Sequence, residues 1–357
     1  MHTLCIFRMS ARLQPAVVGA TGYTGFELTR ILLGHSRVKK PVLLRREGEG
    51  QSPDMTEFYP QLSGNGNGSL PIGPFSWNAV KEQGVDVLFL CTPHEVSREW
   101  GLEAAARGIR VVDLSGAWRL KNPENRKVYG FKDADAAKAA KLDEAAVYGI
   151  PELHSEAIAG AGLVANAGCY ATSVILALAP WVKAGLVDVG HGIICDSKSG
   201  VSGAGKTPTA KTHFVEVAES LSAYSVFGHR HTGEILEQLG VTSEQLQFTP
   251  HLLPIPRGIL STIYVRTKGC ASTTELEQCL RAFYAGKHWV RVFGASRLPE
   301  IKFSLHTNYC DIGFSVAPDG KRVVLVSCLD NLLKGASGQA VQNMNVMFGF
   351  NEGEGLQ

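Results

Sequence analysis

The sequence has no pair of cysteines spaced C-x-x-C, although it contains 8 cysteines in 357 residues. Cysteines that hold a structural zinc ion or form the disulfide framework of a secreted domain come in close, regular groups. Here they are scattered, and several lie in apolar runs such as VLFLC, which ends at Cys91. We therefore expect reduced thiols in a cytoplasmic protein, and no metal site.

Long hydrophobic runs are missing too, since no stretch approaches the ~18 apolar residues of a membrane-spanning helix. The opening MHTLCIFRMSARLQ lacks the apolar centre and cleavage site of a signal peptide, so we expect residues 1–13 to form a disordered leader. Charge of one sign is not in excess, because 35 Lys and Arg stand against 33 Asp and Glu. This balance predicts no nucleic-acid partner and no membrane partner.

Apolar runs and helical patterns alternate along the first part of the chain. The run at 16–18 precedes a glycine-rich turn and an amphipathic helical pattern, and further apolar runs follow at 85–91 and 109–115. Apolar runs separated by helices indicate parallel βαβ units. We predict an α/β fold in which residues 14–165 form a Rossmann-type, doubly wound domain.

The pattern changes beyond residue 165. The chain is long enough for two domains. The runs at 258–267 and 321–330 are longer and alternate more regularly between apolar and polar residues, which suits a mixed or antiparallel sheet. Residues 166–330 are therefore predicted to form a second α/β domain with a mixed sheet.

The stretch GATGYTG, at 19–25, lies between the first predicted strand and the first predicted helix. Small residues there let the backbone approach a pyrophosphate, and the free N–H groups of the helix start attract its charge. Glycines also make ordinary tight turns. Their position in a βαβ series nevertheless favours a dinucleotide-binding loop.

The second predicted strand, PVLLRRE, ends in Arg45 and Arg46 instead of the acid that binds the ribose of NAD. Two guanidinium groups offer charge and forked donors to the 2′-phosphate of NADP. The two arginines are also compatible with a solvated strand edge, and Glu47 leaves NAD open. We predict NADP as the cofactor.

Cys169 lies in NAGCYATS, directly before the helical pattern SVILALA. A thiol at the start of a helix is close to unpaired N–H groups and the positive end of the helix dipole, which lower its pKa and favour the thiolate. We predict Cys169 as a nucleophile. The stretch GHRHTGEI, with His229, His231 and Glu234, could supply the proton donor and acceptor that such a cysteine needs, although it is also compatible with a surface charge patch.

The stretch GVSGAGKT, at 200–207, matches the phosphate-binding loop pattern G-x-x-x-x-G-K-[ST] and follows an apolar run. It leaves open a nucleotide-hydrolysing protein. Pro208 comes soon after the lysine, and the residues that follow have no clear apolar stripe. Both observations weigh weakly against the helix that such a loop requires.

Eight motifs occur in a fixed order between residues 19 and 336: GATGYTG, CTPH, DLSGAWRL, YGIPEL, NAGCYAT, SGVSGAG, GHRHTGEI and DNLLKGA. Together they resemble the motifs of N-acetyl-gamma-glutamyl-phosphate reductases, the NADPH-dependent third enzyme of arginine biosynthesis. The resemblance covers about residues 14–350. It implies that residues 331–357 return to the first domain, and that the second domain carries the subunit contacts of a homodimer or homotetramer.

The resemblance also implies a reaction. The Cys169 thiolate would attack the acyl phosphate of N-acetyl-glutamyl phosphate, release phosphate and form a thioester that NADPH reduces to the semialdehyde. His229 would be the acid/base, His231 would contact the substrate, and Glu234 would orient the two histidines. The segment SGVSGAG would then face the active site, where the phosphate it handles is the one leaving the acyl group.

Other roles follow from the resemblance position by position. Cofactor contacts, besides the two arginines, are expected at Gly19, Thr21, Gly22, Tyr23, Thr24, Gly25, Thr92, Pro93, Ser115, Ser199, Gly200, Asn331 and Gly335. Substrate contacts are expected at Arg119, Ser202, Lys206 and His231. Relatives commonly read S-A-D-F-R where this chain has Ser115-Gly116-Ala117-Trp118-Arg119, so the acidic partner of the arginine is in doubt.

Three alternatives remain at this point. A related acyl-phosphate reductase could act on N-acetylated or carrier-bound aminoadipyl phosphate, because one methylene is worth only ~1–3 kcal/mol of discrimination. It could also act on aspartyl phosphate, although HRHT and YGIPEL argue against the aspartate enzyme. A nucleotide-hydrolysing protein would use the loop at 200–207. A regulator that only senses NADP would not need the thiol of Cys169.

Overall fold

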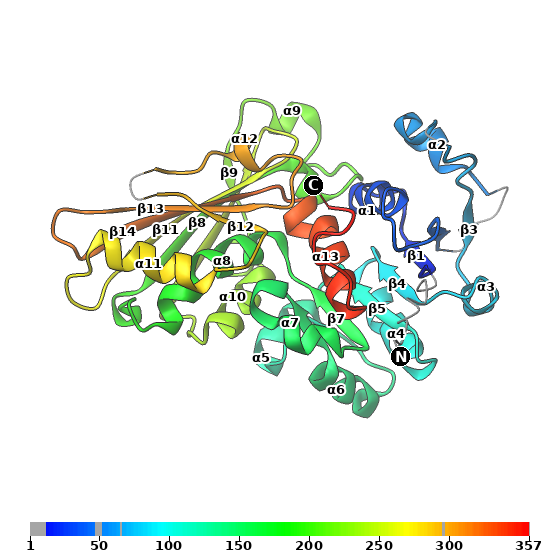
Figure 1. The fold of residues 1–357 in the computed structure, drawn as a ribbon, viewed down its shortest axis with the longest axis horizontal. Helices are drawn as coiled ribbons and strands as arrows, with labels where there is room; N and C mark the ends of the chain where they lie inside the picture. The colour runs from blue at the N-terminus through cyan, green and yellow to red at the C-terminus, as the bar shows by residue number, and fades with distance from the viewer. Residues whose placement is uncertain (1–11, 47–51, 65, 295–296, 357) are drawn as a thin grey trace, which may run out of the picture.

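The computed structural model describes residues 12–46, 52–64, 66–294 and 297–356. The expected leader at 1–13 therefore lies outside the described residues except for its last two, and Glu47 lies outside them too. The described chain contains two seven-stranded sheets, which lie side by side and are covered by helices (Figure 1). Within these residues, no helix is long and apolar enough to cross a membrane.

The first sheet is entirely parallel, with the order β3-β2-β1-β4-β5-β7-β6. Its strands are β1 (Pro15–Val18), β2 (Val42–Arg45), β3 (Ile72–Pro74), β4 (Val87–Leu90), β5 (Arg110–Asp113), β6 (Val147–Gly149) and β7 (Leu163–Asn166). The strand order reverses on either side of β1, as in doubly wound folds that bind ligands at the carboxyl ends of the strands.

Helices cover both faces of this sheet because successive strand residues point to opposite sides. Val17 and Phe89 pack with Leu28 of α1, whereas Val18 and Leu88 pack with Ala104 of α4 on the other face. The helices of this half are α1 (Tyr23–Leu33), α2 (Met55–Phe58), α3 (Trp77–Glu82), α4 (His94–Ala106), α5 (Pro123–Arg126), α6 (Ala136–Ala145) and α7 (Pro151–Ala159). The predicted Rossmann-type arrangement is confirmed.

The second sheet is mixed, with the order β12-β13-β14-β11-β8-β10-β9. Its strands are β8 (Ile193–Gly200), β9 (Ser222–Ala223), β10 (Leu246–Leu253), β11 (Ile259–Arg266), β12 (Val290–Val292), β13 (Cys310–Val316) and β14 (Arg322–Leu329). The β8–β10 and β12–β13 pairs are parallel, and the other pairs are antiparallel. The predicted mixed sheet is also confirmed.

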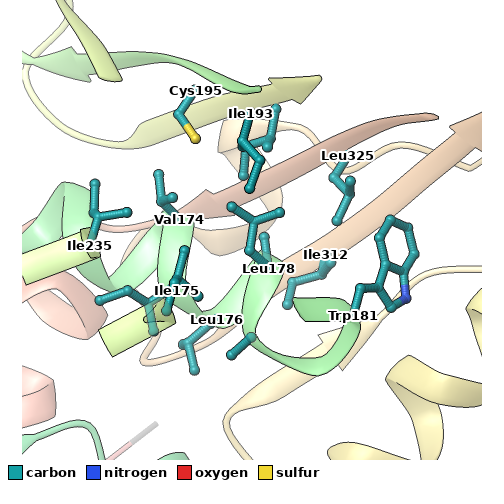
Figure 2. Close-up of a cluster of buried hydrophobic side chains, with 14 of the residues drawn as sticks. Val174, Ile175, Leu176, Leu178, Trp181, Ile193, Cys195, Ile235, Ile312 and Leu325 are labelled. Atoms are coloured by element: carbon teal, nitrogen blue, oxygen red, sulfur yellow. The ribbon is translucent and has the colours of Figure 1, made fainter. Parts of the chain in front are cut away.

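One face of the second sheet is covered by helices α8 (Cys169–Lys183), α10 (His231–Leu239) and α11 (Thr273–Phe283) (Figure 1). Helix α8 is buried from Tyr170 to Trp181, and its side chains meet those of the sheet, such as Cys195 and Leu325 (Figure 2). The short helices α9 (Phe214–Val217) and α12 (Ile301–Ser304) complete this half. The core fixes α8 in place, and with it Cys169 at the helix start.

The chain returns to the first sheet after β14. A π-helical turn at Leu333–Ser337 leads into α13 (Gly338–Met347), which packs against α1 and α7. Val341 and Met344 of α13 are buried in the same core as Val17 and Phe89. The expected return of the C-terminal helix to the first domain is confirmed.

Candidate active site

A cavity of about 530 Å³ lies at the carboxyl ends of the first sheet's strands, between the two halves of the chain. Both halves contribute to it, together with the returning tail. From the expected site, its lining contains Gly19, Gly22, Tyr23, Thr24, Gly25, Thr92, Pro93, Ser115, Arg119, Cys169, Ser202, Lys206, His231, Asn331 and Gly335. We call it the cofactor cavity, because the glycine loop forms one of its walls.

The glycine loop at 19–25 is tightly packed. Gly19 has a left-handed backbone (φ +84°), and a Cβ there would lie 2.4 Å from the carbonyl oxygen of Cys91. A Cβ on Gly25 would lie 2.3 Å from the carbonyl oxygen of Gly19. Gly22 caps α1 with no side-chain hydrogen bond, so the first N–H groups of the helix are left for a ligand. This geometry fits a dinucleotide pyrophosphate.

The other residues expected at the cofactor are held by neighbours. The Thr92 hydroxyl is 2.7 Å from that of Ser97, and the Ser115 hydroxyl donates to Asp113. Asn331 accepts the N–H of Gly258 at 2.7 Å and donates to the Ser202 hydroxyl at 3.0 Å. The carbonyl oxygen of Thr21 accepts the hydroxyl of Tyr59 at 2.9 Å.

Five expected cofactor residues do not line this cavity, and one of them is Thr21 of the glycine loop itself. Arg45 ends β2 and Arg46 follows it at the surface, while residues 47–51 lie outside the described chain. Ser199 and Gly200 line a second cavity, of about 400 Å³, and not the cofactor cavity. We call it the substrate cavity because Cys169 and both histidines line it as well. Cofactor contact by these five residues stays a prediction.

Cys169 lies at the junction of the two cavities, as the first residue of α8. Gly335 of the π-helical turn packs directly on it, since a Cβ there would lie 2.6 Å from the Cβ of Cys169. Burial raises the pKa of the Cys169 thiol to about 11, and the Tyr170 N–H and Arg119 only partly offset this effect. The sequence-based expectation of a lowered thiol pKa is therefore wrong, because burial outweighs the helix N-terminus.

His231 lies against the nucleophile. It lines both cavities, and a Cβ on Gly168 would lie only 2.4 Å from its Nε2 atom. Burial, together with Arg119 and Arg230, holds the pKa of His231 well below its usual range. This imidazole is therefore neutral at pH 7 and can accept a proton.

His229 lines the substrate cavity but not the cofactor cavity. Its Nδ1 atom accepts the backbone N–H of His231 at 3.1 Å, and the two rings are 4.7 Å apart. Burial, followed by the neighbouring His231, lowers the pKa of His229 to about 3. His229 therefore has one nitrogen committed to positioning the backbone of His231.

Glu234 holds the turn before the nucleophile. Its carboxylate accepts the Gly168 N–H at 2.9 Å and the Tyr148 hydroxyl at 2.6 Å. It pairs with Arg119 at 3.1 Å, and its nearest approach to His231 is 3.9 Å, at Nε2. Glu234 therefore mainly holds the turn before Cys169. Of the two histidines that it was expected to orient, it approaches only His231, and only to 3.9 Å.

Arg119 is buried and mostly engaged within the protein. Besides Glu234, its Nε donates to the carbonyl oxygen of Asn166 at 2.8 Å and its Nη2 to that of Leu114 at 2.9 Å. Glu234 therefore supplies the acidic partner that the sequence left in doubt. Arg119 lines the cofactor cavity and not the substrate cavity. A substrate contact by Arg119 therefore stays a prediction.

The stretch at 200–207 does not form a phosphate-binding loop of the nucleotide-hydrolysing kind. A short 3₁₀ helix, Val201–Ala204, follows β8, and the next helix is α9, which begins only at Phe214. Lys206 points across to the first glycine loop, with Nζ 3.4 Å from the carbonyl oxygen of Thr21 and 4.7 Å from the Tyr59 ring. This position favours a cofactor contact over the expected substrate contact.

The sequence interpretation missed several residues of the site. Tyr148 lies in the motif YGIPEL but received no role, although its hydroxyl holds Glu234. Lys211 and Tyr224 line the substrate cavity, and Arg230, which the sequence marked only as part of GHRHTGEI, lines both cavities. No local pattern marks Lys211 or Tyr224, because only the folded chain brings them to Cys169.

Two family models match this chain in succession. The model described as semialdehyde dehydrogenase, NAD binding domain, matches residues 15–161. The model described as semialdehyde dehydrogenase, dimerisation domain, matches residues 169–331.

Curated relatives named N-acetyl-gamma-glutamyl-phosphate reductase are similar over nearly the whole length. The protein from Desulforapulum autotrophicum is 41% identical over 345 residues, which cover 96% of this chain and 97% of the relative. The protein from Pelotomaculum thermopropionicum is 43% identical over 344 residues, 96% of each chain. The protein from Rhodopirellula baltica is 43% identical over 356 residues, 97% of this chain and 99% of its own.

This chain belongs to the N-acetyl-gamma-glutamyl-phosphate reductase family. The resemblance inferred from the eight motifs is confirmed.

Solved structures place this N-acetyl-gamma-glutamyl-phosphate reductase family member in a wider fold group. Aspartate semialdehyde dehydrogenase II of Vibrio cholerae, complexed with ASA, superposes with a TM-score of 0.71 at 17% identity, over 95% of this chain and 98% of its own. A probable aspartate-semialdehyde dehydrogenase from Pseudomonas aeruginosa gives 0.68 at 21% identity, over 94% and 98%. At these identities the likeness shows the α/β fold alone.

Proposed function

We propose that this protein is an NADP-dependent acyl-phosphate reductase that converts N-acetyl-L-glutamyl 5-phosphate to N-acetyl-L-glutamate 5-semialdehyde in arginine biosynthesis. The observation that carries the proposal is the position of Cys169, at the junction of a dinucleotide-type cavity and a second cavity lined by both histidines. Relatives that carry this enzyme's name and are 41–43% identical over almost the whole chain support it.

The glycine loop and the returning tail would hold the dinucleotide. Gly19 and Gly25 leave room that any Cβ would fill, and Asn331 is fixed beside the second glycine loop. Bound NADPH supplies the hydride that reduces the thioester carbonyl. Gly335 leaves space next to the thiol for that approach, because its missing side chain would otherwise meet the Cβ of Cys169.

The resting thiol of Cys169 is protonated at neutral pH because burial raises its pKa, so a base must take the proton before the thiol attacks. We assign this role to His231, in place of the His229 that the sequence favoured. His231 borders both cavities and is neutral at pH 7, whereas His229 is turned to the substrate cavity and holds the backbone of His231. The imidazolium formed would return the proton when the thiohemiacetal collapses.

Glu234 and Arg119 act as positioning residues. Glu234 accepts the N–H of Gly168, which precedes the nucleophile, and Arg119 neutralises the buried carboxylate. This pair keeps the start of α8 in place while phosphate leaves. The cations that line the cavities around the nucleophile, Arg119, Lys206, Lys211 and Arg230, would bind the anionic groups of substrate and cofactor.

The matched dimerisation domain supports an assembly of identical chains. We propose a homodimer or homotetramer, in the cytoplasm, as the sequence predicts. The aminoadipyl and aspartyl substrates are not favoured, because the similar relatives that cover nearly the whole chain are named for the glutamyl compound.

Replacement of the nucleophile tests the reaction. In Cys169→Ser we expect phosphate-dependent reduction of NADP with N-acetyl-glutamate semialdehyde to fall by more than about 10³-fold, because the thioester cannot form. Binding of NADPH, followed by fluorescence titration, should stay unchanged. Cys270→Ser, an exposed cysteine of the second half, is the matched control and should keep full activity. Full activity in Cys169→Ser would exclude the mechanism.

The two histidines can be separated in the same assay. We expect His231→Asn to lower kcat by about 10²–10⁴-fold, since a general base is lost, and His229→Asn to lower it less. A pH-rate profile of both variants should show that only His231→Asn removes the acidic limb. The reverse order of effects would return the role of base to His229.

A further inference from the structure

The segment 209–230 forms the outer wall of the substrate cavity, and we call it the outer wall. Its regular structure is limited to α9 and the two-residue strand β9. Besides the pairing of β9 with β10, the part before His229 is tied to the rest of the chain by the Tyr224 N–H, which donates to Pro250, and by the Tyr224 hydroxyl, 3.3 Å from that of Tyr170. The end of the wall is better anchored, because His229 accepts the N–H of His231 and Arg230 Nη1 lies 3.3 Å from His94 Nδ1. Few hydrogen bonds to the rest of its own chain therefore hold residues 209–228.

The inner side of the wall is polar. From this segment the cavity is lined by Thr209, Lys211, Thr212, Ser222, Tyr224, Ser225, His229 and Arg230. The Lys211 ammonium makes no hydrogen bond or ion pair with any described residue, so it is available to an anionic ligand. The position of the wall thus affects how the cavity binds its substrate.

The outer side carries several exposed apolar side chains, alongside exposed Glu216 and Glu219. Of the 11 large apolar or aromatic side chains exposed in the described chain, 5 lie in this wall: Phe214 (84% exposed), Val215 (76%), Leu221 (56%), Val226 (44%) and Phe227 (79%). Val217 is the only apolar side chain of the wall that is buried. Such a concentration of exposed apolar side chains marks an interaction surface.

We propose that a second copy of this chain covers the apolar side of the outer wall and thereby holds its polar side against the substrate. The occupant is a second copy because the matched dimerisation domain, residues 169–331, contains the whole wall. A symmetric contact buries the same apolar patch on both subunits. The substrate cavity is then complete only in the oligomer, and the identity of the substrate rests on the function proposed above.

Only the substrate side depends on this contact. The glycine loop at 19–25 belongs to the first sheet and is packed by its own chain. A dissociated subunit should therefore keep its affinity for NADPH and lose affinity for the acyl substrate. A general loss of structure would affect both.

A charge placed in the apolar patch tests the proposal. Val215→Asp should lower the mass measured by sedimentation and raise KM for the acyl substrate by at least about tenfold, equivalent to ~1.4 kcal/mol, with NADPH affinity within about twofold of wild type. Val128→Asp, at a 44% exposed valine of the first half, is the matched control and should behave as wild type. Unchanged mass and KM in Val215→Asp would overturn the proposal. Tyr264 is a 44% exposed residue of β11, so it lies outside the wall. Dissociation by Tyr264→Asp without any effect of Val215→Asp would also overturn the proposal.

Dilution of the wild-type protein tests the same idea without a variant. Below the dissociation concentration, KM for the acyl substrate should rise and hydrogen exchange of residues 209–230 should accelerate, while NADPH affinity stays constant. Dissociation without a change in KM would overturn the role of the contact in the cavity. A wild-type oligomer without reductase activity, dissociated by Val215→Asp, would refute the proposed function and leave the interface standing.

Discussion

Two glycine-rich loops face each other across the cofactor cavity, and both match a nucleotide-binding pattern in sequence. In the loop at 19–25, a Cβ on Gly19 or Gly25 would lie within 2.4 Å of backbone atoms. In the loop at 200–207, a Cβ on Gly203 would meet its nearest atom, the Ser199 hydroxyl oxygen, at 3.4 Å. Gly19 and Gly25 of the first loop are close-packed. In the second loop Gly203 has room for a side chain, although a Cβ on Gly200 at its start would lie 2.6 Å from the backbone nitrogen of Arg257.

The element that follows each loop explains the difference. After the first loop α1 begins, and its unpaired N–H groups form an anion site. After the second, a short 3₁₀ helix leads into irregular chain, so phosphate binding there depends on the side chain of Lys206. Glycine spacing alone therefore does not distinguish a backbone anion site from a loop that carries one cation.

Of the substitutions in the two loops, one in the first loop is expected to lower NADPH affinity most. Gly25→Ala places a methyl group 2.3 Å from the carbonyl oxygen of Gly19, so α1 must shift away from the loop. We expect NADPH affinity to fall by about 10- to 100-fold, in line with the ~1–3 kcal/mol cost of overpacking. Isothermal titration with NADPH would measure the loss of affinity, and a denaturation curve would measure any loss of stability.

Gly203→Ala is the control for that substitution in the opposite loop. The added methyl group would make only ordinary contacts with Ser199 and Asn331, at 3.4 and 3.7 Å. Affinity and stability should stay within about 0.5 kcal/mol of wild type. Equal losses in the two alanine variants would show that the loops do not differ as we describe.

A smaller effect is expected for Lys206→Ala. The exposed ammonium faces the first glycine loop, so its loss should weaken NADPH binding by about two- to fivefold at low salt, the range of a surface ion pair. The difference should shrink as salt screens the charge, and Lys206→Arg should restore most of the affinity. A higher KM for the acyl substrate with unchanged NADPH affinity would instead support the substrate contact inferred from the sequence.

The sequence predicted the local parts of the site well. The glycine loop and Cys169 lie next to a strand and at a helix start, and both placements depend on residues within a few positions of each other. Alternation of apolar runs was enough to distinguish the parallel first sheet from the mixed second one.

What the sequence could not predict depends on contacts between distant segments. Lys206 meets Thr21 across 185 positions, and Glu234 meets Gly168 across 66. The raised pKa of Cys169 results from burial in the assembled chain, which the pattern around the cysteine does not reveal. The resemblance implies His229 as the acid/base, whereas the structure places His231 against the nucleophile, a contact that the local pattern does not reveal.

The return of the tail to the first sheet has a consequence for how the protein is made. Val341 and Met344 complete the core around Val17, and Asn331 and Gly335 complete the site around the nucleophile. On the ribosome, the amino-terminal half has to wait, with part of its core exposed, until these late residues emerge. The nascent chain cannot turn over substrate before then, because Asn331 and Gly335 are missing from the site.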